Sequence, residues 1–173
     1  TNAIETLRAT YSIPFIGIEP AIKPAALKSK TKVVGVLATQ GTLSSTLFAK
    51  TSAAFTQDVL VVEQIGSGLV EAIETGLLDD PKLTKLVRSY INPMLEQEMD
   101  TLVLGCTHYP LLLPLLKKVL PSNIQIIDSA EAVAKETHRI LEENQLICQT
   151  KEIGHIQYFS SAKNSTLLRF IPK

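Results

Sequence analysis

The sequence predicts an α/β fold in which helices alternate with the strands of a parallel sheet. Short apolar runs rich in strand-forming residues alternate with longer segments whose apolar residues recur at helical spacing. Strands that are separated by helices imply βαβ units and hence a parallel sheet. Two stretches, VVGVLATQGT and TLVLGCTH, also share one pattern, an apolar strand that ends in a threonine-bearing turn before a helix.

The N-terminal third is expected to build the first βαβ unit. Residues 5–11 have the pattern of the end of a helix, and the apolar run at residues 13–18 predicts a strand. A proline-marked crossover over residues 20–27 leads to a second strand at residues 32–39. A helix is expected next, over residues 41–55.

The middle of the chain repeats the alternation. Residues 58–65 predict a strand, and residues 67–76 predict a short amphipathic helix. A longer helix is expected over residues 79–99, where two aspartates before a proline give a start signal. Residues 101–105 form a short apolar run of the kind found in strands that are covered on both faces.

The C-terminal third is expected to continue in the same way. A helix over residues 110–120 is followed by a strand at residues 124–128 and a helix over residues 131–144. Residues 154–161 predict a last strand, and a weak helical pattern comes after it.

Composition describes an ordinary globular chain. It has 173 residues, of which 45% are hydrophobic and 20% charged, and its formal net charge is zero. Neutrality argues against nucleic acid as the main partner, because phosphate binding usually needs a basic surplus. No apolar stretch approaches the length of about 20 residues that spans a membrane, so we expect a cytoplasmic protein without a membrane partner.

The two cysteines, Cys106 and Cys148, do not have the spacing of a zinc site, and we expect no metal. A disulfide between them stays open as an alternative, although thiols of a reducing compartment remain free. Cys148 lies beside apolar residues in LICQ, which predicts a packing role.

The turn after the strand at residues 101–105 contains three consecutive residues with reactive or hydrogen-bonding side chains. Gly105 ends the strand and Pro110 can begin a helix, so Cys106, Thr107 and His108 are expected on a strand-to-helix turn. A helix N-terminus favours a thiolate. A threonine hydroxyl and backbone N–H groups can cradle a carboxylate, and a histidine can donate a proton or partner the thiol. The alternative is a small buried thiol beside a surface histidine.

A second candidate loop follows the strand at residues 32–39. Ligands of open α/β sheets bind beyond the carboxyl ends of the strands, which places residues 38–42 on the same rim as the cysteine turn. Thr39 and Thr42 are two hydroxyl donors for an anionic ligand, whereas a helix cap and a turn glycine at Gly41 would explain them equally well.

Other titratable residues have structural roles as their default interpretation. Glu74 is expected as a surface carboxylate and Glu19 as a turn residue. His138 and His155 have no companions at catalytic spacing, which predicts structural roles for both.

Several motifs of this chain resemble those of one known family. LGCTHYPLL resembles the second cysteine motif of glutamate racemases, in the cofactor-independent aspartate/glutamate racemase superfamily. Further stretches resemble the same family along essentially the whole chain: IPFIGIEPAIKPAA, GVLATQGTLSS, IGSGLVEAIETG and IQIIDSAEAVA. His108 favours glutamate racemases over aspartate racemases, which tend to have Glu after the Cys–Thr pair.

The resemblance implies a two-domain α/β enzyme that supplies D-glutamate for peptidoglycan synthesis. Family members invert the α-carbon of glutamate with two cysteines, one on each face, and need neither a cofactor nor a metal. Cys106 would then be the base for one enantiomer, assisted by His108. The resemblance also assigns substrate contacts to Thr39, Thr42, Thr107 and His108, with Glu74 as a carboxylate behind them.

The chain departs from the family pattern at its start. The first cysteine of the family lies in a Cys–Asn–Thr turn before the helix that ends as AIETLRATY, and this chain begins after that turn. We therefore expect residues 1–22 to end the first domain, residues 23–128 to form the second, and residues 129–173 to begin the return to the first. Such a chain is expected to be inactive by itself.

A smaller departure is IGSGLVE, where many members carry Cys–Pro. It indicates a branch that a muramic-acid peptidoglycan precursor activates. A homodimer is left open.

Two other functions remain open on the sequence. The chain would be a noncatalytic carboxylate-binding domain if Cys106 were inert, and thiol reactivity with iodoacetamide well below pH 8 separates this hypothesis from the racemase. It would be a relative of aspartate racemases if aspartate were the preferred substrate.

Overall fold

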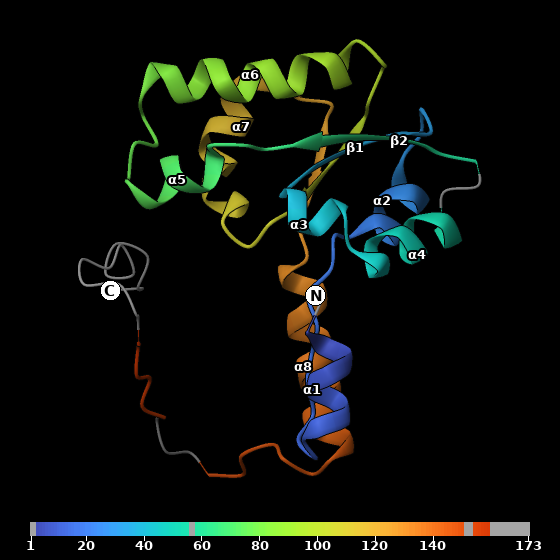
Figure 1. Cartoon of the computed structure of the whole chain (residues 1–173), viewed down its shortest axis with the longest axis vertical. Helices are drawn as coiled ribbons and strands as arrows, with labels where there is room; N and C mark the ends of the chain where they lie inside the picture. The colour runs from blue at the N-terminus through green and yellow to red at the C-terminus, as the bar shows by residue number, and fades with distance from the viewer. Residues whose placement is uncertain (1–2, 56–57, 151–153, 160–173) are drawn as a thin grey trace.

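A computed structural model gives the structure of the protein and describes residues 3–55, 58–150 and 154–159. In this part of the chain, four parallel strands form one sheet in the order β2-β1-β3-β4 (Figure 1). The strands are β1 (Val33–Ala38), β2 (Leu60–Ile65), β3 (Thr101–Gly105) and β4 (Gln125–Ile127). The predicted α/β class with a parallel sheet is therefore confirmed.

Helices cover both faces of the sheet and connect its strands (Figure 1). One face carries α2 (Ile22–Lys28) and α4 (Thr46–Phe55), and the other carries α5 (Leu69–Glu74), α6 (Pro81–Leu95) and α7 (Leu113–Val119). The remaining helices are α1 (Ile4–Thr10), α3 (Gln40–Leu43), the 3₁₀ helix η1 (Tyr109–Leu112) and α8 (Ala130–Glu143).

Alternation along the central strands creates two cores. On β1, Val34 and Val36 face the core beneath α2 and α4, whereas Leu37 faces the core beneath α5, α6 and α7. Successive side chains of a strand point to opposite faces, so a strand covered on both faces is apolar throughout. Gly35 faces the second core, where a Cβ would lie 2.2 Å from the sulfur of Met99. The methionine side chain takes the room that a larger residue would need.

Polar side chains set the helix boundaries that differ from expectation. The helix predicted over residues 41–55 is divided into α3 and α4, because the Ser45 hydroxyl donates to the carbonyl of Thr42 and accepts from the N–H of Phe48, which caps a new helix. The helix predicted over residues 79–99 begins at Pro81, where Asp80 accepts from the backbone N–H of Lys82 at 2.7 Å.

Two predicted strands are absent from the described sheet. Residues 13–18 run from α1 towards the sheet without a ladder partner, and the Phe15 carbonyl accepts instead from the Arg8 guanidinium at 2.9 Å. Residues 154–159 have no regular structure, and the weak C-terminal helix lies outside the described residues. The apolar runs were correctly recognised, but a strand also needs a neighbour that pairs with its backbone groups.

The helices α1 and α8 lie together away from the sheet (Figure 1). Side chains of both helices line one cavity with residues 11–19. We call α1, residues 11–18 and α8 the terminal arm. Within the described residues, no helix has both the length and the apolar character required to cross a bilayer.

Candidate active site

Two neighbouring strands deliver the candidate residues to one edge of the sheet. Ala38 of β1 pairs with Gly105 of β3 in parallel register, so the next residues are Thr39 and Cys106. Paired strands lie about 4.8 Å apart, which makes the two residues direct neighbours at the carboxyl ends of their strands. The prediction that the two loops share an edge is confirmed.

The turn that carries Cys106 is held by close packing. A Cβ at Gly105 would lie 2.6 Å from the Ala38 Cβ and 3.2 Å from the Pro20 Cγ, so only glycine lets the three segments meet. The Cys106 carbonyl accepts from the N–H of Tyr109 at 3.1 Å. The helix expected from Pro110 starts as η1 at Tyr109 and becomes α-helical only at α7. The thiol therefore precedes a tight 3₁₀ turn.

The two threonines of the second loop contact each other. The hydroxyls of Thr39 and Thr42 are 3.0 Å apart, and the Thr39 hydroxyl also accepts from the N–H of Thr42 at 3.3 Å. Thr39 is thus the cap of α3, as the structural alternative predicted. Because each hydroxyl has one hydrogen and their mutual bond uses one, the pair retains one hydrogen to donate to a ligand.

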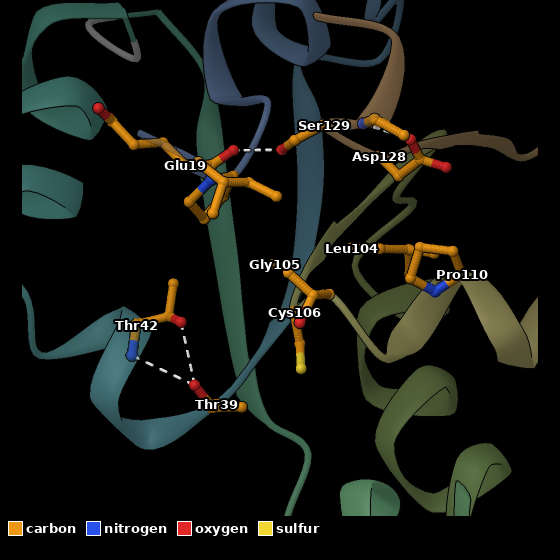
Figure 2. Close-up of a pocket in the computed structure, with 13 residues that line it drawn as sticks. Glu19, Thr39, Thr42, Leu104, Gly105, Cys106, Pro110, Asp128 and Ser129 are labelled. Atoms are coloured by element: carbon orange, nitrogen blue, oxygen red, sulfur yellow. Dashed lines mark hydrogen bonds between the residues drawn. The ribbon is translucent and has the colours of Figure 1, made fainter. Parts of the chain in front are cut away.

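A cavity of about 380 Å³ opens between these loops. Figure 2 shows the Cys106 sulfur between the Thr39–Thr42 pair and Pro110. The lining residues come from both rim loops and from the two chain passages into the terminal arm: Ile18, Glu19, Pro20, Thr39, Thr42, Leu104, Gly105, Cys106, Thr107, Pro110, Asp128, Ser129 and Ala130. Hydroxyls and a thiol thus share the cavity with two carboxylates, and none of these lining residues is a lysine or arginine.

His108 contacts α5 and is not among the lining residues of this cavity. Its Nε2 lies 3.2 Å from Oε1 of Glu74, on the last turn of α5, and its side chain is 35% exposed. The imidazole pairs with the carboxylate of Glu74 on α5 instead of lining this cavity, so its contact with a substrate stays a prediction. The structure does bring together His108 and Glu74, two residues that are 34 positions apart in the sequence.

The sequence interpretation missed the cavity residues at the entrance to the arm. The Ser129 hydroxyl donates to the backbone carbonyl of Glu19, and the Glu19 carboxylate accepts from the Thr51 hydroxyl at 2.9 Å. Asp128 directly follows β4 and accepts from the N–H of Ala130 at 2.9 Å. The same strand-end rule that found Thr39 and Cys106 could have found Asp128, because β4 is parallel to β3.

The remaining candidates lie away from the cavity. Both cysteines are free. Cys148 is exposed and hydrogen-bonded to the Thr150 hydroxyl, which lowers the pKa of its thiol, so the predicted packing role is wrong. His138 pairs with Glu142 on the surface of α8. Among the described residues, no three His, Cys, Asp or Glu side chains form a group that could hold a metal ion.

These features define a class of protein, a parallel α/β domain with a thiol and paired hydroxyls at the carboxyl ends of adjacent strands. The chain belongs to the Asp/Glu/Hydantoin racemase family, whose model matches residues 1–137. It is 44% identical over 171 residues to the glutamate racemase of Pseudomonas putida strain F1, and 44% identical over 170 residues to that of Pseudomonas entomophila. Both matches cover 98% of this chain, which spans 64% of the length of these relatives.

Solved glutamate racemases share the fold. The Escherichia coli enzyme, in complex with L-glutamate and the activator UDP-MurNAc-ala, matches 80% of this chain and 53% of its own with a TM-score of 0.72 at 34% identity. The isoform RacE1 from Bacillus anthracis matches 84% of this chain and 55% of its own with a TM-score of 0.72 at 33% identity. The Francisella tularensis enzyme in complex with D-glutamate has a TM-score of 0.64 at 27% identity, over 73% of this chain and 48% of its own.

Proposed function

We propose that this chain carries one half of a glutamate racemase active site, which interconverts L- and D-glutamate without a cofactor. The observation that carries the proposal is the Cys106 thiol, placed beside the Thr39–Thr42 pair in a cavity at the strand ends. The family match and the many glutamate racemases among its relatives support glutamate rather than aspartate as the substrate.

The proposed reaction is a proton exchange at the α-carbon. The Cys106 thiolate removes the α-proton of one enantiomer, and the electron pair of the broken C–H bond moves into the carboxylate. A thiol on the opposite face then returns a proton to the carbon, and the two thiols exchange roles for the reverse reaction. A weak carbon acid needs donors aimed at the carboxylate, for which we propose the hydroxyls of Thr39, Thr42 and Thr107.

The second thiol has to come from elsewhere. Besides Cys106 the sequence has one cysteine, Cys148, and the residues that directly follow α8 lie at the far end of the terminal arm from the sheet (Figure 1). We propose that Cys148 takes no part in the reaction. The 173-residue chain alone is then expected to leave both glutamate enantiomers unchanged.

The wider assignments follow from the same proposal. We propose that His108 assists Cys106 in proton transfer and that the Glu74 carboxylate keeps the His108 ring in place. In the whole enzyme, residues 23–128 would form the second domain, and residues 1–22 and 129–173 would belong to the first. The reaction would supply cytoplasmic D-glutamate for peptidoglycan, with a muramic-acid precursor as activator in line with the ligand of the E. coli structure.

Protection of Cys106 from alkylation tests the proposal on the chain as it is. A Cys148→Ser background leaves one thiol, whose reaction with iodoacetamide is followed by mass spectrometry from pH 6 to 9. We expect glutamate to slow the reaction several-fold more than aspartate does, because bound substrate would cover the sulfur.

Variants identify the contacts. Thr42→Val keeps the shape of the side chain but removes its hydroxyl, and should abolish protection by glutamate. Thr84→Val, on α6 and outside the cavity, is the matched control and should keep it. A thiol that glutamate does not protect would refute the proposed site. A protected thiol that reacts no faster than free cysteine would favour a noncatalytic carboxylate-binding domain, and stronger protection by aspartate would favour an aspartate racemase relative.

A further inference from the structure

Consecutive residues of the cysteine turn contact opposite ends of α5. The Tyr109 hydroxyl donates to the backbone carbonyl of Gly66 at 3.1 Å, three residues before α5 begins. His108 Nε2 lies 3.2 Å from Oε1 of Glu74, the last residue of α5. The helix is about 9 Å long at 1.5 Å per residue, so the two contacts bracket it.

The contact at the start of α5 is buried and tight. Tyr109 is fully buried, and a Cβ at Gly66 would lie 2.4 Å from its hydroxyl oxygen, so the glycine is what lets the phenol approach. Burial raises the pKa of the phenol, with smaller contributions from Cys106 and its other neighbours, so the hydroxyl remains a donor. The same loop is also held by the bond from the N–H of Gly66 to the carbonyl of Ala38, at 2.9 Å.

A second tyrosine holds the next residue of this loop. The Tyr90 hydroxyl donates to the Ser67 carbonyl at 2.8 Å. Two phenols from different elements, η1 and α6, therefore fix consecutive carbonyls immediately before α5.

The contact at the end of α5 depends on this anchoring. The side chains of His108 and Glu74 are 35% and 54% exposed, and exposed pairs of this kind stabilise little by themselves. Glu74 can stay beside His108 only if α5 itself is fixed, and the helix is fixed by its buried residues Leu69 and Ile73 and by the loop before it.

We propose that Tyr109 is a positioning residue, which holds α5 through the Gly66 carbonyl and so keeps Glu74 against His108. A carboxylate accepts hydrogen bonds, so this contact favours the ring form that carries a hydrogen on Nε2. The role of this ring beside Cys106 rests on the proposed racemase function, whereas the coupling from Tyr109 to His108 does not.

The coupling is measured by NMR of the chain labelled with ¹⁵N at its histidine rings. The chemical shifts of the His108 nitrogens, recorded across pH, report which nitrogen carries the hydrogen and whether Glu74 is in contact. Glu74→Ala defines the shift that follows from complete loss of the contact. Tyr109→Phe should produce at least about half of that shift, and it should produce no further shift in the Glu74→Ala background, because both changes act on one contact.

A control and a second variant keep the test decisive. Tyr11→Phe makes the same chemical change at an exposed site on the terminal arm and should leave the His108 signals unchanged. If Tyr109→Phe does not fold, Tyr90→Phe removes the neighbouring bond of the loop and should shift the same signals in the same direction. A folded Tyr109→Phe protein with wild-type His108 signals, or equal shifts with and without Glu74, would overturn the proposal. Neither result depends on racemisation or on thiol reactivity.

Discussion

Asp100 provides a stability prediction at the edge of the sheet opposite the cavity. It precedes β3, and its Oδ2 accepts from the backbone N–H groups of Lys30 and Thr31 at 2.6 and 2.9 Å. Its Oδ1 accepts from the Thr101 hydroxyl at 3.0 Å. Partial burial raises the pKa of the carboxyl, but these hydrogen bonds and the adjacent Ser29 side chain outweigh it and lower the pKa from 3.8 to about 2. The ionised form thus ties the loop before β1 to the start of β3.

The sign and size of the effect follow from linkage. A carboxyl whose pKa is lower in the folded state binds fewer protons there, so it stabilises the fold above its unfolded pKa and loses this contribution as the pH falls from about 4 to about 2. One pKa unit corresponds to about 1.4 kcal/mol, which gives about 2 kcal/mol for the full shift. Because Asp100 is only partly buried, solvent screening reduces the expected contribution to about 1 kcal/mol.

Urea unfolding at a series of pH values measures this contribution. Between pH 5 and pH 2, the free energy of unfolding of the wild-type chain should fall by about 1 kcal/mol more than that of Asp100→Asn. Asp79→Asn removes an exposed carboxylate from the connection between α5 and α6, and it controls for the loss of one negative charge. If Asp100→Asn and wild type lose equal stability over this range, the hydrogen bonds to Asp100 do not favour its ionised form, and the reasoning fails.

Three further substitutions test the packing described above. Gly105→Ala should weaken the protection of Cys106 by glutamate about tenfold, because its Cβ would lie 2.6 Å from that of Ala38 and displace the turn; unchanged protection would contradict the close approach. Gly35→Ala should cost about 1 to 3 kcal/mol of unfolding free energy by overpacking against Met99, as urea titration would show, and a neutral effect would mean that the methionine moves freely. Tyr109→Phe should lower the free energy of unfolding by about 1 kcal/mol, because the Gly66 carbonyl loses a buried donor but keeps its bond from the N–H of Leu69. A stabilised variant would count against the bond between Tyr109 and Gly66.

The sequence was sufficient to predict what depends on local pattern. Apolar runs between helices located all four strands of the sheet, and the strand-end rule placed Thr39 and Cys106 together. The same local pattern failed at residues 13–18, because apolarity and β-propensity do not say whether a pairing neighbour exists. The Ser45 cap that divides α3 from α4 was also within a region that looked uniformly helical.

Contacts between segments that are distant in the sequence could not be predicted from local sequence patterns. The direction of the His108 ring depends on where α5 places Glu74, and nothing within the CTHYP motif specifies that position. The participation of Glu19 and Ser129 in the cavity depends on two passages of the chain that are 110 residues apart. The family resemblance supplied residue roles but not these orientations.

The bond between Ser129 and Glu19 has a mechanical consequence for the cavity. The chain passes between the sheet and the terminal arm twice, and this bond ties the two passages side by side where they meet. A single linker would allow the arm to rotate about the axis of the linker. Two passages that are bonded to each other resist this rotation, and the easier motion is then a hinge rotation about the line through both passages. Both passages contribute to the cavity wall. A change in the angle between the arm and the sheet would therefore alter the width of the cavity mouth, whereas β1 and β3, which carry Thr39 and Cys106 at their ends, would keep their pairing register.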